Sequence, residues 1–165
     1  MLLEVKLRLF TPVLGGLRPD QGGVRRFQRT NGRLLVSQFH FEESIGLASH
    51  NLGMASAEAF LRFEHTCLPP TIVLYDRRYR AGGAQQRELF EAFRKGTVIT
   101  FKVILRDDIP GCPSLPQVQQ LFELAGEFAG MSPFGGKFGM GRFSVEQIGQ
   151  AISLPANMAV MEAHG

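Results

Sequence analysis

The chain has 165 residues, a mass of 18.3 kDa and a formal net charge of +3, and 44% of its residues are hydrophobic. These values fit one globular domain with its own core and exclude a disordered, collagen-like or disulfide-dependent chain. No apolar run is long enough to cross a bilayer, and the two cysteines are too far apart in sequence to form a metal-binding pair. We therefore expect a single domain over residues 1–165, located in the cytoplasm and without a cofactor.

The first part of the chain is predicted to contain a strand, a long loop and a helix. Residues 2–9 are typical of a half-buried strand because Val5 and Leu7 alternate with Lys6 and other charged residues. Residues 11–33 hold five glycines and two prolines, so we expect a long loop or an irregular hairpin. A helix is predicted from residue 38, with Ser37 as its N-cap and Gly53 as its stop signal.

The middle of the chain is predicted to be less regular. Residues 60–68 alternate and predict a strand, which the two prolines at 69–70 would end. Residues 71–75 form a short apolar run, and residues 76–86 are predicted to be an exposed excursion. Residues 87–93 predict a short helical turn.

Strand, helix and strand patterns follow. Residues 97–106 alternate, with Ile99 and Phe101 on the apolar face, and end in turn residues. Residues 115–128 carry a helical apolar stripe, with Pro116 suited to the first turn and Gly130 to the C-terminal cap. Residues 142–148 supply a last strand. The order strand, helix, strand, strand, helix, strand predicts an α+β, ferredoxin-like βαββαβ fold with loop insertions.

Arginines gather in two segments, and aromatic residues lie among them. The clusters are Arg18, Arg25, Arg26, Arg29 and Arg33, and then Arg77, Arg78, Arg80 and Arg87. Phe27 lies within the first cluster, and Tyr75 and Tyr79 lie within the second. Interleaved cations and rings suit single-stranded nucleic acid, because bases stack on rings at about 1–3 kcal/mol each while arginines pair with phosphates. For each ring taken alone, the alternative is an anchor in the core.

Six glycines fall between residues 126 and 141, where the predicted helix gives way to the last strand. The segment is not a P-loop, because it lacks the Gly-Lys-Ser/Thr ending, nor a dinucleotide fingerprint, because its helix comes first. Two interpretations remain. One is a tight packing turn, and the other is a concavity of backbone amides, flanked by Lys137 and Arg142, that binds phosphates or sugars.

Three stretches, "LRLFTPVLGG", "NGRLLVSQFHFEESIGLAS" and "LAGEFAGMSPFGGKFGMGRFSV", together resemble the RAMP superfamily, the RNA-binding ferredoxin-like proteins of CRISPR systems. Short phage-encoded proteins with a "GxGRF"-like loop are similar. The resemblance implies a glycine-rich loop lying against single-stranded nucleic acid or a neighbouring subunit, with the open sheet face and basic loops completing the groove. It assigns backbone approach to Gly135, Gly136, Gly139 and Gly141, and phosphate contact to Lys137 and Arg142. The chain has room for one ferredoxin-like unit, whereas many RAMP proteins have two.

An alternative is a metal-independent endoribonuclease. In RAMP-type endoribonucleases a histidine near the first helix transfers protons, and His40 or His50 occupies a similar place in this sequence. The acidic pairs at 42–43 and 107–108 do not predict a two-metal site, because adjacent helical residues point about 100° apart and the second pair opens a turn. No metal is expected.

The sequence as a whole predicts a non-catalytic protein that binds single-stranded RNA or DNA. The apolar tail, residues 149–165, together with the resemblance, predicts a homo-oligomer or filament. A third interpretation is a phage or CRISPR accessory module that binds only another protein. The residues predicted to bind nucleic acid are Arg18, Arg25, Arg26, Arg29, Arg33, Arg77, Arg78, Tyr79, Arg80, Gly135, Gly136, Lys137, Gly139, Gly141 and Arg142.

Overall fold

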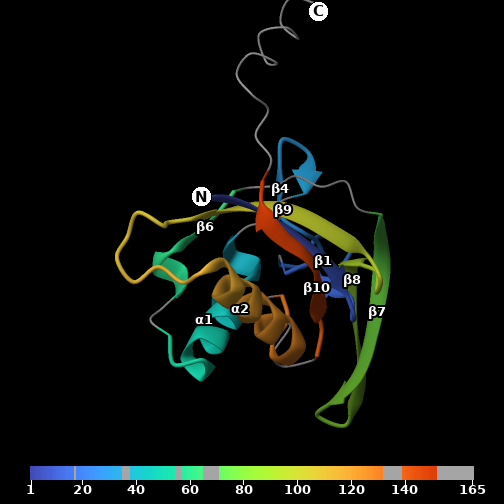
Figure 1. Ribbon diagram of the computed structural model, residues 1–165. Helices are drawn as coiled ribbons and strands as arrows, with labels where there is room; N and C mark the ends of the chain where they lie inside the picture. The colour runs from blue at the N-terminus through green and yellow to red at the C-terminus, as the bar shows by residue number, and fades with distance from the viewer. Residues whose placement is uncertain (17, 35–37, 55–56, 65–70, 132–138, 152–165) are drawn as a thin grey trace, which may run out of the picture.

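The computed structural model describes residues 1–16, 18–34, 38–54, 57–64, 71–131 and 139–151. Figure 1 shows two helices side by side on one face of a sheet, with a long two-stranded ribbon beside them. The elements in chain order are β1 (Leu2–Leu9), β2 (Val13–Leu14), β3 (Val24–Arg25), β4 (Arg29–Thr30), β5 (Arg33–Leu34), η1 (Gln38–His40), α1 (Glu42–Asn51), η2 (Ala57–Ala59), β6 (Leu61–Phe63), β7 (Ile72–Ala81), β8 (Ala84–Phe93), β9 (Val98–Leu105), α2 (Leu115–Phe128) and β10 (Phe143–Gln150).

The main sheet has the strand order β10-β1-β9-β6, and all of its neighbouring strands are antiparallel. In the central strand β1, residues from Leu3 to Leu9 alternate between buried and exposed, as the sequence predicts. Strand β9 alternates in the same way, with Ile99 and Phe101 buried. The apolar residues of both strands face α1 and α2, so the core lies between the sheet and the two helices.

Helix α2 follows its sequence signals closely. Ser114 caps its N-terminus in a reciprocal capping box with Gln117, and a proline occupies the first turn. Gly130 follows its end with φ of +84°. Helix α1 begins later than predicted, at Glu42, because η1 comes first; the predicted cap Ser37 lies outside the described residues. Gly53, with φ of +65°, follows its end as predicted.

The α+β fold is confirmed, and its order is that of the ferredoxin-like class. Taking β1, β6, β9 and β10 as strands 1 to 4, the sheet order 4-1-3-2 places each crossover helix between strands that are not adjacent. Two insertions decorate this core. Residues 10–34 follow β1 and include the short strands β2 to β5, and the β7–β8 ribbon lies between β6 and β9.

Three predictions about local structure need correction. Residues 87–93 are not a helical turn but the second half of β8, paired along its length with β7. The strand predicted over 60–68 is observed only as β6, and residues 65–68 lie outside the described part of the chain. The predicted tail overlaps β10, which runs to Gln150, and the Ala151 N–H then donates to the Leu2 carbonyl.

Phenylalanines fill the centre of the core. Phe41 lies 4.9 Å from Phe101 and 5.2 Å from Phe63 between ring centres, and Phe122 and Phe143 meet it edge-on. Such tilted and edge-to-face pairs are the arrangements that aromatic rings prefer in interiors. Within the described residues, no helix has the length and apolar character to span a membrane.

Candidate nucleic-acid interface

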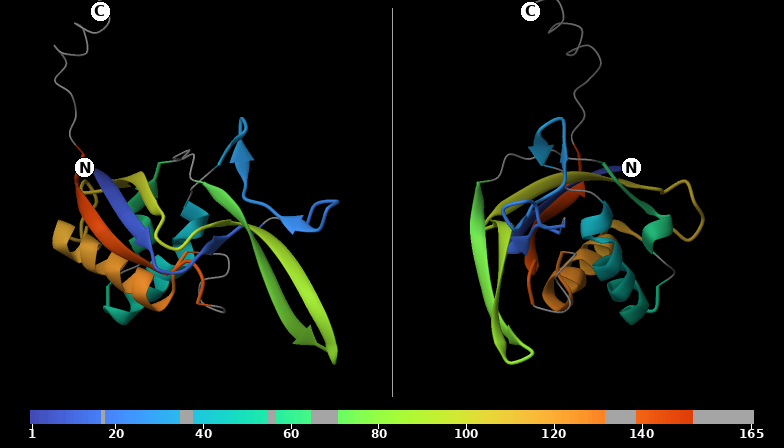
Figure 2. Two further views of the ribbon diagram at one scale, coloured as in Figure 1. Left: turned by 90° about the vertical axis from the view of Figure 1, so that its right-hand side faces the viewer. Right: turned by 180° about the vertical axis from the view of Figure 1, so that it is seen from behind.

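The β7–β8 ribbon, called the hairpin below, projects from the body of the protein (Figure 2). Gly82 and Gly83 form its two-residue turn, with φ of 59° and 79°. Positive φ at both turn positions matches the right-handed twist of the flanking strands. Because residues opposite each other in an antiparallel pair share a face, the register gives the hairpin two distinct faces. We call these the Tyr79 face, with Tyr75 and Arg77, and the Asp76 face, with Arg78 and Arg80.

The Tyr79 face carries two half-buried tyrosine rings with different contacts. The Arg77 guanidinium lies over the Tyr79 ring, 4.6 Å from its centre, and pairs with Glu88 at 3.6 Å. The Tyr79 hydroxyl donates to Glu88 Oε1 at 3.2 Å. Tyr75 instead packs with Phe90 in a small apolar cluster at the base of the hairpin. Of the two tyrosines, Tyr79 is therefore the one that contacts charged side chains of the hairpin.

The Asp76 face carries more positive than negative charge. Asp76 accepts a hydrogen bond from Arg87 Nε at 3.0 Å and pairs with Arg78 at 3.5 Å. Arg80 is exposed, and its side chain has no ion pair or hydrogen bond with any described residue. Two arginines thus share the Asp76 carboxylate, and the Arg80 side chain pairs with no described carboxylate. Exposed pairs of this kind contribute little to stability, so the guanidinium groups are accessible to a phosphate.

Strand pairing and side-chain hydrogen bonds join the segment of the first arginine cluster to the hairpin. Strand β3 pairs in parallel with β8, and Glu91 of β8 points into the segment that follows β3. Arg29 binds Glu91 through both nitrogens, from Nη1 to Oε1 at 2.8 Å and from Nη2 to Oε2 at 2.7 Å. The Phe27 N–H donates to Oε1 at 2.9 Å. The Phe27 ring is buried and stacks on Phe93 at 4.3 Å, so it anchors the segment instead of facing a base.

Arg26 completes this ion-pair network. It pairs with Asp20 Oδ2 at 2.6 Å and with Glu91 Oε2 at 3.4 Å. The hydrogen bond from Arg29 lowers the pKa of Glu91 despite its burial. The Val24 N–H and then Arg26 lower the pKa of Asp20. Both carboxylates are therefore charged at neutral pH, and Arg26 and Arg29 are already paired.

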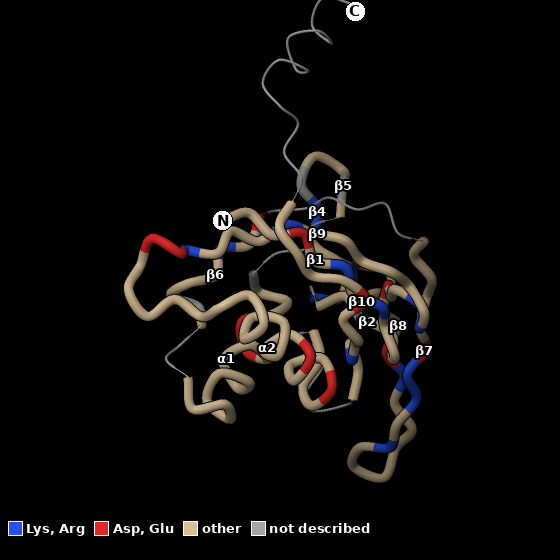
Figure 3. Tube along the Cα trace, in the orientation of Figure 1, with Lys and Arg blue, Asp and Glu red and all other residues tan. Residues whose placement is uncertain are grey.

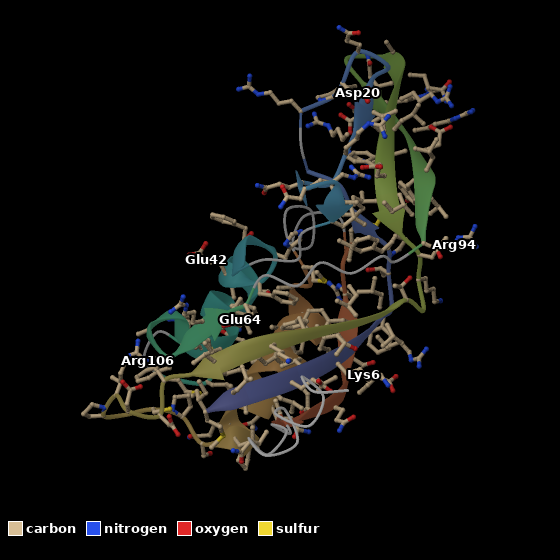
Figure 4. All side chains as sticks on the ribbon, turned by 90° about the horizontal axis from the view of Figure 1, so that it is seen from above. Lys6, Asp20, Glu42, Glu64, Arg94 and Arg106 are labelled. Atoms are coloured by element: carbon tan, nitrogen blue, oxygen red, sulfur yellow. The ribbon has the colours of Figure 1, made fainter. Side chains whose placement is uncertain are left out.

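The structure thus brings Arg25, Arg26 and Arg29 of the first predicted cluster against the hairpin that carries the second. Figure 3 shows Lys and Arg following β7, and Figure 4 places Asp20 at the hairpin end of the molecule, opposite Arg106. Arg18 is exposed and Arg25 half-buried, and the side chain of neither has a hydrogen bond or ion pair with a described residue. The side chain of Arg33 lies outside the described part of the structure.

The described part of the glycine segment packs tightly against the protein itself. A side chain at Gly126 of α2 would overlap the carbonyl and ring of Phe143. One at Gly130 would lie 2.7 Å from the Met140 carbonyl oxygen, and one at Gly141 would lie 2.6 Å from the Met131 carbonyl oxygen. These three glycines let the end of α2 close against the start of β10.

The remaining predicted residues of this segment have different surroundings. A side chain at Gly139 would meet open space, although its φ of +67° disfavours other residues. Gly135, Gly136 and Lys137 lie outside the described residues. The close approach that glycine permits is therefore intramolecular at the three packed positions, and contact with nucleic acid stays a prediction for the others.

Arg142, which the sequence predicts to contact phosphate, makes a hydrogen bond within the protein. Its Nη1 donates to the Glu127 carbonyl at 2.9 Å, in the last turn of α2, where a cation also complements the helix dipole. Its Nε is buried without a hydrogen-bond partner among the described residues. The backbone N–H of Arg142 donates to Thr11 Oγ1 at 2.9 Å. Its predicted phosphate contact remains untested.

The endoribonuclease alternative assigns proton transfer to either of two histidines. His40 is half-buried in η1, before α1, and His50 is exposed in the last turn of α1. A catalytic role for either one stays a prediction. Among the described residues, no group of three or more His, Cys, Asp or Glu side chains is arranged to hold a metal ion.

Two features of the interface are missed by sequence reasoning. One is the hairpin, although Gly82-Gly83 between two extended runs is a known signal for a two-residue turn. The other is Glu91, because no sequence pattern marks a single carboxylate as the buried partner of arginines 62 and 65 residues away.

Comparisons with known proteins show a likeness in structure and none in sequence. No protein-family model matches the chain, and no curated protein matches it by sequence. Among solved structures, a chain described as part of a CRISPR RNA-guided surveillance complex superposes with a TM-score of 0.52 and 12% sequence identity. The alignment covers 98% of this chain and 80% of the other. At this identity the likeness shows a shared fold.

Proposed function

We propose that the protein is a non-catalytic binding protein for single-stranded nucleic acid, and that the hairpin and residues 18–34 form its interface. The observation that carries the proposal is that strand β3 and the Glu91 contacts hold Arg25, Arg26 and Arg29 against the hairpin, although the two arginine clusters are more than 40 residues apart in sequence. A continuous cationic surface attracts a polyanion, whereas isolated arginines do so weakly.

The chemistry of the hairpin fits a single strand better than a duplex. Tyr79 is a partly exposed ring with a cation over one face, and Arg78, Arg80 and Arg87 line the other side of the same ribbon. Rings that stack on bases beside cations that pair with phosphates are typical of single-strand recognition. The fold likeness to a subunit of an RNA-guided complex supports RNA as the first ligand to test.

Self-assembly and the glycine loop belong to the same proposal. The apolar tail residues and Gly135, Gly136 and Lys137 lie outside the described structure, so their support comes from the sequence alone. Sedimentation of the protein with and without oligonucleotide tests assembly, and a strictly monomeric protein in both would remove that part. Lys137→Ala tests the loop without disturbing the packed glycines.

The main experiment measures fluorescence anisotropy with labelled single-stranded RNA, single-stranded DNA and duplex across a range of salt concentrations. We expect tight single-strand binding that weakens with salt, with a slope of about 0.7 per phosphate neutralised. Arg80→Ala is expected to lower that slope by about 0.7. The matched control is Arg62→Ala in β6, an equally exposed arginine of the main sheet, which is expected to leave the slope unchanged.

Failure to bind any of the three ligands at low salt would remove the proposal. Equal effects of Arg80→Ala and Arg62→Ala would place binding elsewhere on the surface.

A further inference from the structure

Glu91 is the one charged side chain among the described residues that is buried. Its side chain is 6% exposed, whereas the side chain of Asp76, on the same face of the same hairpin, is 33% exposed. Both carboxylates bind two arginines. The arginines of Asp76, Arg78 and Arg87, are part of the hairpin itself. The arginines of Glu91, Arg26 and Arg29, come from residues 18–34, which we call the arginine loop.

The contacts of Glu91 therefore connect two separate segments. Both of its oxygens are bound by Arg29, Oε1 also accepts from the Phe27 N–H, and Oε2 is also near Arg26. Other contacts also hold the loop: the short pairing of β3 with β8, the Phe27 ring on Phe93, the buried side chains of Val24 and Leu34, and the close approach of the loop backbone to Gly15. The described side-chain hydrogen bonds from the arginine loop to β8 thus share a single acceptor, the Glu91 carboxylate.

A buried carboxylate of this kind acts as a unit with its partners. Charge burial is costly unless the charge is paired and hydrogen-bonded, and removing one partner leaves the other uncompensated. Replacing Glu91 by a neutral side chain would remove the charged acceptor that Arg29, Arg26 and the Phe27 N–H share. The arginine loop would then lose these charge-assisted contacts with β8.

We infer that Glu91 is a positioning residue, which holds the arginine loop against the hairpin so that Arg25 lies on the same face of the sheet as Arg77 and adds its charge to that face. This inference rests on the proposed function, and it assigns to Arg26 and Arg29 the role of fastening the loop instead of contacting phosphate. Arg25, next in sequence to Arg26, opposes Phe90 in the β3–β8 pair, and its position depends on that fastening.

The positioning role is tested by whether Glu91→Gln strengthens or weakens the binding of an oligonucleotide. Glu91→Gln and Asp76→Asn each remove one negative charge from the same face of the hairpin. Electrostatics alone predicts tighter binding of single-stranded oligonucleotide by both variants. The positioning role predicts that Asp76→Asn binds about 2-fold more tightly, and that Glu91→Gln binds about 10-fold more weakly, a loss of about 1.4 kcal/mol.

Limited digestion with trypsin, which cuts after arginine and lysine, reports on the loop without any oligonucleotide. We expect cleavage after Arg25, Arg26 or Arg29 to become faster in Glu91→Gln and to stay unchanged in Asp76→Asn. Arg29→Lys serves as a second variant if Glu91→Gln does not fold. Arg29→Lys keeps the net charge but loses the bidentate contact with Glu91. It should therefore also speed cleavage of the arginine loop and weaken oligonucleotide binding.

Two results would overturn the inference: tighter binding by Glu91→Gln, or loop cleavage that neither Glu91→Gln nor Arg29→Lys accelerates. Absence of binding by the unmodified protein would instead remove the proposed function. In that case the digestion still decides whether Glu91 fixes the loop.

Discussion

The packing of Gly126 against Phe143 makes a quantitative prediction about stability. Gly126 lies in the last turn of α2, and a β-carbon there would overlap both the carbonyl and the ring of Phe143. In an exposed helix, Gly→Ala stabilises by about 1 kcal/mol because alanine has the better helix propensity. At Gly126 the added methyl group has to displace backbone, which a flexible side chain cannot absorb.

The expected size follows from these opposing effects. Overpacking in a close-packed core costs about 1–3 kcal/mol, and contact with backbone puts this site at the upper end. After the gain in helix propensity, Gly126→Ala is expected to lower the free energy of unfolding by about 2 kcal/mol. For a domain of this size that corresponds to a melting temperature lower by about 4–8 °C.

Thermal unfolding followed by circular dichroism measures this shift. Gly149→Ala in β10 is the matched control, because a side chain there meets no atom within 4 Å, and its melting temperature should not fall. An unchanged or raised melting temperature for Gly126→Ala would refute the reasoning. It would show that the end of α2 can move away from β10 at no cost, and that the glycine is free for another role.

Further predictions concern the hairpin, the loop anchor and one surface ion pair. Gly83→Val is expected to destabilise the hairpin by about 1–3 kcal/mol, because a β-branched residue is strained at φ of +79°; NMR amide exchange in β7 and β8 would detect it. Phe93→Ala removes the buried ring that stacks on Phe27 and is expected to cost about 3–5 kcal/mol in urea unfolding. The hydrogen bond from Arg106 lowers the pKa of Asp108 to about 2, so this pair persists above that pH and is lost as the pH falls through it. Arg106→Ala should return the NMR titration of Asp108 toward its ordinary value of 3.8.

Much of the core topology could be predicted from the sequence, because its elements carry strong local signals. Period-two alternation in β1 and β9, Pro116 in the first turn of α2 and Gly130 after its end are signals that act over a few residues, and each is found where it was predicted. The β7–β8 hairpin could not be predicted from local signals of this kind. Residues 87–93 contain two phenylalanines at a spacing that a helix also allows, and only pairing with β7 decides between the two.

In the candidate site, too, some features are visible in the sequence and others only in the structure. The arginine clusters are visible in the sequence as runs of charge, but their sequence does not say which arginines are already paired. Arg26 and Arg29 satisfy the buried carboxylate of Glu91, whereas Arg80 has no described partner. Likewise the glycine count is evident, but only the approach of α2 to β10 shows that Gly126, Gly130 and Gly141 serve packing.

The sequence by itself determined the α+β order of this protein and the location of its basic segments, because both depend on short-range pattern and composition. Tertiary structure alone decided that the two basic segments lie against each other, through the pairing of β3 with β8 and the burial of Glu91. The physical reason is that strand pairing and charge burial join residues more than 60 positions apart, and no local signal encodes such a partner.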